Sequence, residues 1–118
     1  MSLLATWVPD RREIIWINFN PQIGKEMKDM HPMLVLSPKA FNARTGLIIG
    51  LPMSSSESNL NNPFAVDNSK GLNQRSFIIC NQPKSLDWRQ RGARPHPWER
   101  VSPAILKLVC QEVNDIMQ

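Results

Sequence analysis

The 118-residue chain is predicted to fold as a mainly β domain, a small antiparallel sheet or barrel that ends in one helix. Two observations predict this fold class. Five short segments rich in β-branched, aromatic and other apolar residues recur along the chain, separated by polar, turn-forming residues. After residue 102 the apolar residues adopt the spacing of one face of a helix.

The first two predicted strands enclose a charged loop. Ile14 to Phe19 is rich in β-branched and aromatic residues, and Met33 to Ser37 is almost entirely apolar. The loop between them contains a glycine and several charges, and it ends in His31 followed by a proline. Because binding and catalytic residues are often carried by polar loops on a rigid scaffold, this loop is the first candidate site.

Three further strands and one helix are expected along the rest of the chain. The strands are Gly46 to Pro52, Phe64 to Val66 and Ser76 to Cys80, and the polar segment after Pro52 is expected to be a mobile surface loop. Ser102 fits a helix N-cap with Pro103 at the first helical position. The helix is expected to pack over the sheet or over a partner subunit, through apolar residues at Ile105, Val109, Val113 and Ile116, flanked by Leu106, Leu108 and Met117.

Length and composition predict a single domain spanning residues 1–118 with one core, since 42% of the residues are hydrophobic. The chain contains neither a membrane-length apolar run nor a secretory leader pattern, so a soluble, intracellular protein is expected. Cys80 and Cys110 lie among apolar neighbours without metal-site spacing, and both are predicted to be buried free thiols.

Most common enzyme motifs are missing from the sequence. The glycines form neither GxGxxG nor a P-loop, and no GxSxG or CxxC is found. With only two histidines, hydrolase triads and metal chemistry also lack their usual parts, although a scattered triad stays open. No cofactor and no metal site is therefore expected.

The charge pattern suits a polyanionic partner. The net charge is +4, and the segment from Lys84 to Arg100 carries five basic residues against two acidic ones, with Trp88 and Trp98 between them. The basic groups could hold phosphates while an indole stacks on an unpaired base. Alternatively, the tryptophans pack onto the core while the arginines stay in water. This segment alone does not decide between the two interpretations.

Several motifs occur in a fixed order over nearly the whole chain, and together they resemble the MazF/PemK/Kid family of bacterial toxin endoribonucleases. They are a strand with Ile14, Trp16, Phe19 and Pro21, a loop with Gly24, Glu26 and Pro32, VLSP at Val35 to Pro38, the FN and TG of FNARTG, Pro52 with Ser54 and Ser55, NQPKSLDWRQRGA from Asn81 to Ala93, and the helix after Ser102.

The resemblance implies a small SH3-like antiparallel barrel of the CcdB/PemK type with a C-terminal helix, which forms a homodimer. It further implies the toxin of a type II toxin-antitoxin system, a cytoplasmic mRNA interferase held inactive by a MazE-like antitoxin. Such toxins cut single-stranded RNA at short sequences without a metal or cofactor. The ribose 2′-OH attacks the neighbouring phosphate, so the protein must supply a base, an acid and cationic stabilisation.

The resemblance also implies the site residues, with departures from the family pattern. His31 stands where the family usually has a catalytic Arg, and Ser54 keeps the hydroxyl of the usual Thr. Imidazole can transfer protons near neutral pH but lacks the guanidinium's bidentate grip on phosphate. The catalytic residues implied are His31, Ser54 and Lys25, and the residues implied to bind RNA or hold the loop are Glu26, Ser55, Asn81, Gln82, Lys84 and Arg89.

Each of these assignments has an alternative in which the residue has only a structural role. His31 could be a loop histidine bound to backbone, Lys25 and Glu26 a solvated pair, and the serines simple turn residues. Trp16 and Phe19 are expected to serve core or dimer packing. At the level of function, the alternative is a weakened or inactive family member that binds RNA, an antitoxin or, by analogy of fold with CcdB, gyrase.

Overall fold

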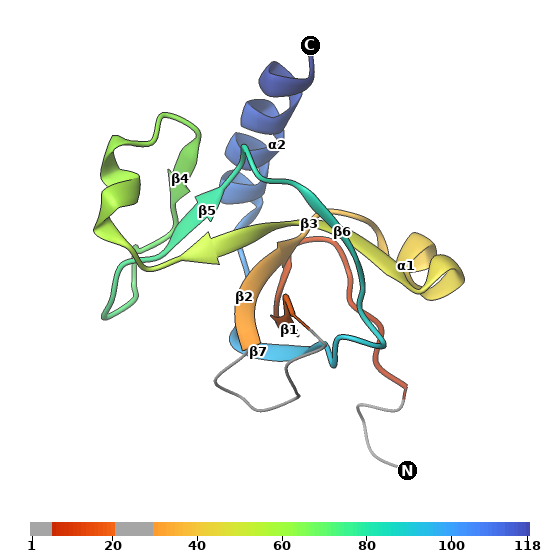
Figure 1. The fold of residues 1–118 in the computed structure, drawn as a ribbon. Coiled ribbons are helices and arrows are strands. Elements are labelled where there is room, and N and C mark those ends of the chain that lie inside the picture. The colour runs from red at the N-terminus through yellow and green to blue at the C-terminus, as the bar shows by residue number, and fades with distance from the viewer. Residues whose placement is uncertain (1–5, 21–29) are drawn as a thin grey trace.

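The computed structural model describes residues 6–20 and 30–118. The described residues form seven strands. Figure 1 shows the C-terminal helix α2 on one side of the sheet and the short helix α1 at the beginning of β3. The elements are β1 (Glu13–Asn18), β2 (Met30–Val35), α1 (Lys39–Thr45), β3 (Leu47–Ser54), the 3-10 helix η3 (Glu57–Asn61), β4 (Ala65–Asp67), β5 (Phe77–Ile79), β6 (Lys84–Asp87), β7 (Arg94–Arg100) and α2 (Pro103–Met117).

All strand pairs are antiparallel and form one curved sheet in the order β4-β5-β3-β2-β1-β7, with β6 also paired to β3. This confirms the predicted mainly β antiparallel fold with a C-terminal helix. Within the described residues, β4 and β7 are not paired with each other, so the barrel-like sheet stays open between these two ends. That the whole chain 1–118 forms one domain stays a prediction, because residues 1–5 and 21–29 lie outside the described part.

The five expected strands are confirmed. Four elements were missed: β6, β7, α1 and the 3-10 helix η3, which forms within the segment expected to be a mobile surface loop. β6 has the sequence KSLD and β7 has the sequence RPHPWER, so neither has the apolar character from which strands are predicted. Pro95 and Pro97 argue further against a strand, because proline lacks the N–H that a ladder needs. β7 accommodates both because it pairs only with β1 among the described strands, at the end of the sheet.

β1 and β2 are buried on both faces, which explains why both read as nearly continuous apolar runs. Alternate residues enter two different clusters. Ile14 and Leu34 belong to a cluster beneath α2, whereas Ile15 and Met33 belong to a second cluster on the opposite face. Burying one such side chain contributes roughly 1.5–3 kcal/mol, so the hairpin pair supplies much of the stability of the domain.

α2 begins as the sequence predicts. The Ser102 hydroxyl accepts a hydrogen bond from the Ile105 backbone N–H at 3.1 Å, and Pro103 follows the cap. The helix covers the first cluster through Val109 and its apolar neighbours, which confirms packing over the sheet. The prediction for Cys110 is wrong: this thiol is exposed, because the next helical position is rotated about 100° away from buried Val109.

Cys80 is a buried free thiol, as predicted. Burial raises the pKa of the Cys80 thiol to about 11, so it is protonated at neutral pH and acts as a small apolar residue. No helix of the described chain is long and apolar enough to cross a membrane.

Buried Asn42 connects segments that are far apart in the sequence. Its side-chain amide donates to the Pro9 carbonyl at 2.8 Å and to the Ser37 carbonyl, and its Oδ1 accepts from the Ser37 hydroxyl at 2.6 Å. Its backbone carbonyl accepts from Trp88 Nε1 at 2.9 Å. A fully buried amide with these partners is satisfied, and removal of the side chain would leave several buried polar groups unpaired.

The same contacts settle part of the ambiguity over the segment from Lys84 to Arg100. Trp88 is buried in the second cluster, so the packing interpretation is confirmed for this indole. Arg91 donates to the Asn18 and Phe19 carbonyls at 3.2 and 2.8 Å and is therefore engaged within the fold. Trp98 is only partly buried, and its position is taken up with the site below.

Gly50, at the centre of β3, provides a test of the sheet. A Cβ at this position would lie 2.3 Å from the Leu34 carbonyl oxygen, and relief requires the β2 backbone to move. We expect Gly50→Ala to lower the free energy of unfolding by roughly 1–3 kcal/mol, as overpacking does in other cores. Urea denaturation measures it. Ser85→Ala, an exposed change on the paired strand β6, serves as control, and an unchanged midpoint for Gly50→Ala would contradict the close approach of β2 and β3.

Candidate functional site

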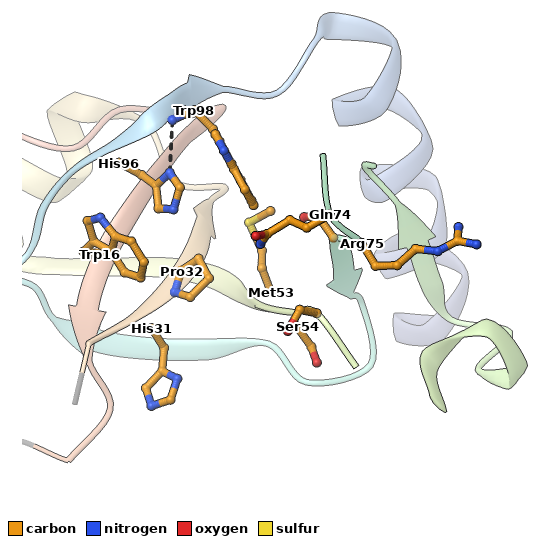
Figure 2. A pocket seen from close by; sticks show the side chains of 11 residues that line it. Trp16, His31, Pro32, Met53, Ser54, Gln74, Arg75, His96 and Trp98 are labelled. Carbon is orange, nitrogen blue, oxygen red and sulfur yellow. Dashed lines mark hydrogen bonds between the residues drawn. The ribbon is translucent and has the colours of Figure 1, made fainter. Parts of the chain in front are cut away.

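A cavity of about 460 Å³ opens where β2, β3 and β7 meet, and Figure 2 shows the side chains around it. This volume lies within the roughly 300–1,000 Å³ typical of sites for small molecules. Its residues come from five separate stretches of the chain, and they are Trp16, His31, Pro32, Met53, Ser54, Ser55, Gln74, Arg75, Ser76, His96 and Trp98. The cavity therefore joins three residues that the sequence pointed to, His31, Ser54 and Ser55, with eight others.

His31 and Ser54 share one side of this cavity. β2 and β3 pair with Met33 opposite Pro52, and continuing that register by two residues sets Ser54 opposite His31. Residues opposite one another in an antiparallel pair project from the same face of the sheet. In Figure 2 both side chains point to the side away from His96 and Trp98. An imidazole and a hydroxyl are thus brought together, as the sequence-based hypothesis requires.

A short aromatic stack supports His31. Its ring stacks on Phe19 with the centroids 5.2 Å apart, and the Lys84 ammonium lies 5.7 Å from the same Phe19 centroid. Phe19 in turn packs against the second core cluster. The stack limits the orientations of the exposed imidazole and brings a cation to its neighbourhood. Phe19 therefore combines the expected core packing with a contact to the candidate site.

The other side of the cavity is aromatic. The His96 ring lies between two tryptophans, with its centroid 4.4 Å from that of Trp16 and 4.6 Å from that of Trp98. Trp16 and Pro32 face each other across β1 and β2 and lie on the face that also carries Ile14. The expectation that Trp16 serves core or dimer packing is therefore incomplete, because its indole also lines the cavity.

A large bulge in β7 creates this aromatic side. Glu13 pairs with Arg100 and Ile15 pairs with Pro95, so the single residue Ile14 faces the four residues from His96 to Glu99. Glu99 has φ of 62°, a left-handed conformation that is costly for a residue with a side chain. Bulges re-aim side chains next to functional sites, and here the bulge turns His96 and Trp98 to the cavity.

The protonation of His96 is set by its surroundings. The ring is 6% exposed, and its Nδ1 accepts a hydrogen bond from the Trp98 backbone N–H at 3.0 Å, drawn as the dashed line in Figure 2. Burial lowers the pKa of His96 below its ordinary value, because the charged form loses its hydration. A neutral ring that accepts at Nδ1 carries its proton on Nε2.

The remaining wall is polar and comes from the turn between β4 and β5. It carries Gln74, Arg75 and Ser76. Arg75 is held only by long ion pairs, 3.6 Å to Asp67 and 3.9 Å to Glu57, with about half of its own side chain exposed. Such exposed pairs contribute little energy, so the guanidinium can be redirected at small cost. The Ser76 hydroxyl is buried and has no hydrogen-bond partner in the part of the chain that the structure describes.

The other residues implied to be in the site are distributed differently. Lys25 and Glu26 lie outside the described residues. Asn81 and Gln82 are exposed in the turn after β5 and do not line the cavity. Arg89 donates to the Ala43 carbonyl at 3.0 Å and lies over the Trp88 ring, so it contacts α1 and is not among the residues that line the cavity. Contacts of these residues with RNA stay predictions.

Within residues 6–20 and 30–118, no three His, Cys, Asp or Glu side chains are grouped closely enough to hold a metal ion. Sequence analysis named Trp98 as one of two indoles that could stack on a base, but it missed Arg75 and His96 as site residues. Arg75 falls in a polar stretch without a motif. The PHPW stretch of the bulge, with histidine and tryptophan separated by prolines, is the one local signal that could have drawn attention to it.

Comparison with known proteins agrees with this fold. The family model described as PemK-like, MazF-like toxin of type II toxin-antitoxin system matches residues 10–117. Endoribonuclease toxin MazF of Escherichia coli strain K12 is 32% identical over 112 residues, which cover 95% of this chain and 96% of that protein. Endoribonuclease PemK of Escherichia coli is 29% identical over 110 residues, which cover 92% of this chain and 81% of that protein.

Solved structures are similar over the same extent. A crystal structure of MazF from Deinococcus radiodurans has a TM-score of 0.78 and 32% identity, covering 94% of this chain and 97% of that one. A MazE-MazF structure from the same organism has a TM-score of 0.79 and 29% identity, covering 94% and 96%. With 108 residues inside the family model, from 10 to 117, this chain belongs to the PemK-like, MazF-like family of toxins of type II toxin-antitoxin systems.

Proposed function

We propose that this chain is an endoribonuclease toxin that cleaves single-stranded RNA at short sequences without a metal ion. One observation carries the proposal: His31 and Ser54, from the neighbouring strands β2 and β3, both line one cavity. The family and the curated relatives named as endoribonucleases support the reaction class. The net charge of +4 suits a polyanionic substrate.

The proposed reaction is an internal transesterification of RNA. The 2′-oxygen forms a bond to the neighbouring phosphorus, and the bond from phosphorus to the 5′-oxygen breaks. The proton of the 2′-OH passes to a base, and the departing 5′-oxygen takes a proton from an acid, leaving a 2′,3′-cyclic phosphate and a 5′-OH. DNA lacks the attacking hydroxyl and is not a substrate.

The cavity residues suit these roles. The His31 imidazole is the proposed group that accepts or donates a proton, and the Ser54 hydroxyl donates a hydrogen bond to a non-bridging phosphate oxygen. Arg75 supplies a permanent charge after it leaves its loose contacts with Asp67 and Glu57. Lys25 stays a proposed catalytic partner in the adjoining loop, and Glu26 a proposed RNA contact or support of that loop.

A second function is favoured by one observation. Figure 2 shows the Arg75 side chain directed away from His31, so the guanidinium is not at the proposed phosphate position. A chain without a fixed cation at the phosphate could bind RNA or an antitoxin without cleaving. This binding module is the alternative that the experiments below separate from the nuclease.

We also propose the partners that the family suggests. MazE-MazF complexes are among the similar solved structures, so a MazE-like antitoxin is the proposed inhibitor of this chain. We propose a homodimer, for which light scattering of the purified protein is the test. Because the proposed substrate is mRNA, the cytoplasm is the proposed location.

The first test is incubation of the purified chain with a long unstructured RNA in EDTA. We expect fragments with 2′,3′-cyclic phosphate and 5′-OH ends at recurrent short sequences, because no step needs a metal. Mass spectrometry of the ends measures the outcome. A matched RNA with deoxyribose at the cut positions is the control and should stay intact. If the unmodified RNA also stays intact, the binding module is correct and the nuclease is not.

Removal of the imidazole tests the role of His31. We expect His31→Ala to lower kcat by roughly 10²–10⁴, the usual contribution of a general acid or base. Asn114→Ala, an exposed change on α2, is the control for handling and folding. His31→Arg should raise activity if the chain is a weakened family member. A His31→Ala protein that cuts at the full rate would remove His31 from the mechanism.

The proposed cation is tested with Arg75→Gln. We expect kcat to fall by roughly 10²–10³ with the fold unchanged, since a single transition-state donor contributes about this much. Arg44→Gln removes the same charge from the exposed end of α1 and should change kcat little. Equal rates for both variants would show that Arg75 supplies no stabilisation at the phosphate.

A further inference from the structure

The aromatic side of the cavity has no role in the reaction proposed above, although the fold maintains it at a cost. Four residues of β7 face one residue of β1, and Glu99 adopts a left-handed conformation to close the bulge. Backbone strain of this kind costs of order 1–3 kcal/mol and persists only where surrounding contacts hold it. Its result is a slot whose walls are Trp16, His96 and Trp98.

His96 contributes to the slot a hydrogen-bond donor in a fixed direction. His96 Nδ1 is occupied by the Trp98 N–H, and Nε2 has no partner among the described residues. Figure 2 shows this second ring nitrogen turned to the hollow bounded by Pro32, Met53 and Trp98. His96 is 6% exposed, and its one ring nitrogen without a partner among the described residues faces the cavity, which is the arrangement of a ligand contact.

The walls fit an unpaired nucleobase. Aromatic side chains offer faces on which bases stack, with roughly 1–3 kcal/mol per base, and Met53 adds an apolar surface. The cavity of about 460 Å³ is continuous with the side that carries His31 and Ser54. A base in the slot is therefore assigned to the same RNA strand as the phosphate at His31 and Ser54.

We propose that this slot is a base-recognition subsite, in which His96 Nε2–H donates to the carbonyl oxygen of a keto base. Uracil and guanine present that oxygen where cytosine and adenine present an amino group. Two facing donors cannot bond, so the amino bases are rejected. The proposal rests on the proposed function, because it concerns a nucleotide of the same RNA substrate.

The neutral form of the His96 ring explains why the slot would accept keto bases and reject amino bases. The amide N–H of Trp98 keeps Nδ1 as an acceptor, which prevents the tautomer that would offer a lone pair to an amino group. His96 lines two hollows: Glu13, Glu99 and Arg100 are the charged residues that line one of them, and Arg75 and the titratable His31 line the other. Burial of the imidazole keeps it neutral at physiological pH.

Binding is tested with uncleavable probes. Fluorescein-labelled deoxyhexanucleotides carry one variable base, dU, dG, dC or dA, flanked by abasic sites, and anisotropy gives Kd for the full chain. We expect dU and dG to bind roughly tenfold more tightly than dC and dA, the difference of one hydrogen bond gained or one buried donor left unpaired. Equal affinity for the four probes would overturn the proposal.

Two variants separate the two nitrogens of His96. His96→Asn keeps an acceptor for the Trp98 N–H but does not reach the Nε2 position, and we expect the four affinities to become equal within about twofold, the level left when the discriminating hydrogen bond is absent. His96→Gln places an N–H near the Nε2 position and should keep the order of preference. A keto preference that survives in a folded His96→Asn protein overturns the proposal.

A measurement on the unaltered protein covers the case in which these variants fail to fold. The chain has two histidines, so imidazole ¹⁵N resonances are readily assigned. We expect His96 to show the Nε2–H tautomer, and its Nε2 resonance to shift on addition of the dU probe but not of the dC probe. A keto preference without RNA cleavage would refute the nuclease and keep the subsite. RNA cleavage without any base preference at this position would refute the subsite and keep the nuclease.

Discussion

The two-sided burial of β1 and β2 is the constraint on which the rest of the molecule depends. Each strand contributes alternate residues to two different cores, so a slip of one residue would exchange both sets at once. The pairing register of β1 and β2 is therefore fixed more firmly than that of a sheet with one face exposed to solvent. That register places Pro32 beside Trp16 on one face and aims His31 from the other, and continued onto β3 it sets His31 against Ser54. The geometry of the cavity follows from core packing, before any contact within the site is considered.

The fold was predictable where the local sequence pattern of a segment agrees with its position in the folded domain. Ile14 to Phe19 is apolar because both faces are buried, and Ser102 with Pro103 starts a helix by local chemistry alone. β6 and β7 were not predictable, because their stability comes from long-range partners. β6 forms along β3, and β7 forms along β1 despite two prolines and a four-residue bulge. Cys110 was wrongly predicted to be buried, because its apolar neighbours in the sequence lie on other faces of the helix.

The candidate site was predictable only in part, for the same reason. His31, Ser54 and Ser55 followed from a family resemblance, and the structure places all three at one cavity. Arg75, His96 and Trp98 carry no motif, since the turn after β4 and the bulge in β7 bring them there through strand pairing. The basic segment from Lys84 to Arg100 illustrates the limit of composition. It contains a core indole in Trp88, an arginine that binds backbone carbonyls in Arg91, and the aromatic wall in Trp98.

The bulge in β7 separates residues that hold the sheet together from residues that form the wall of the slot. Its ends, Pro95 and Arg100, pair with β1, and the four residues between them have no partner in this register. Replacement or shortening of the intervening four residues would then alter the wall of the slot while the paired ends keep the scaffold in register. A change confined to these residues would therefore test the proposed base contact separately from the strand pairing that holds β7 to β1.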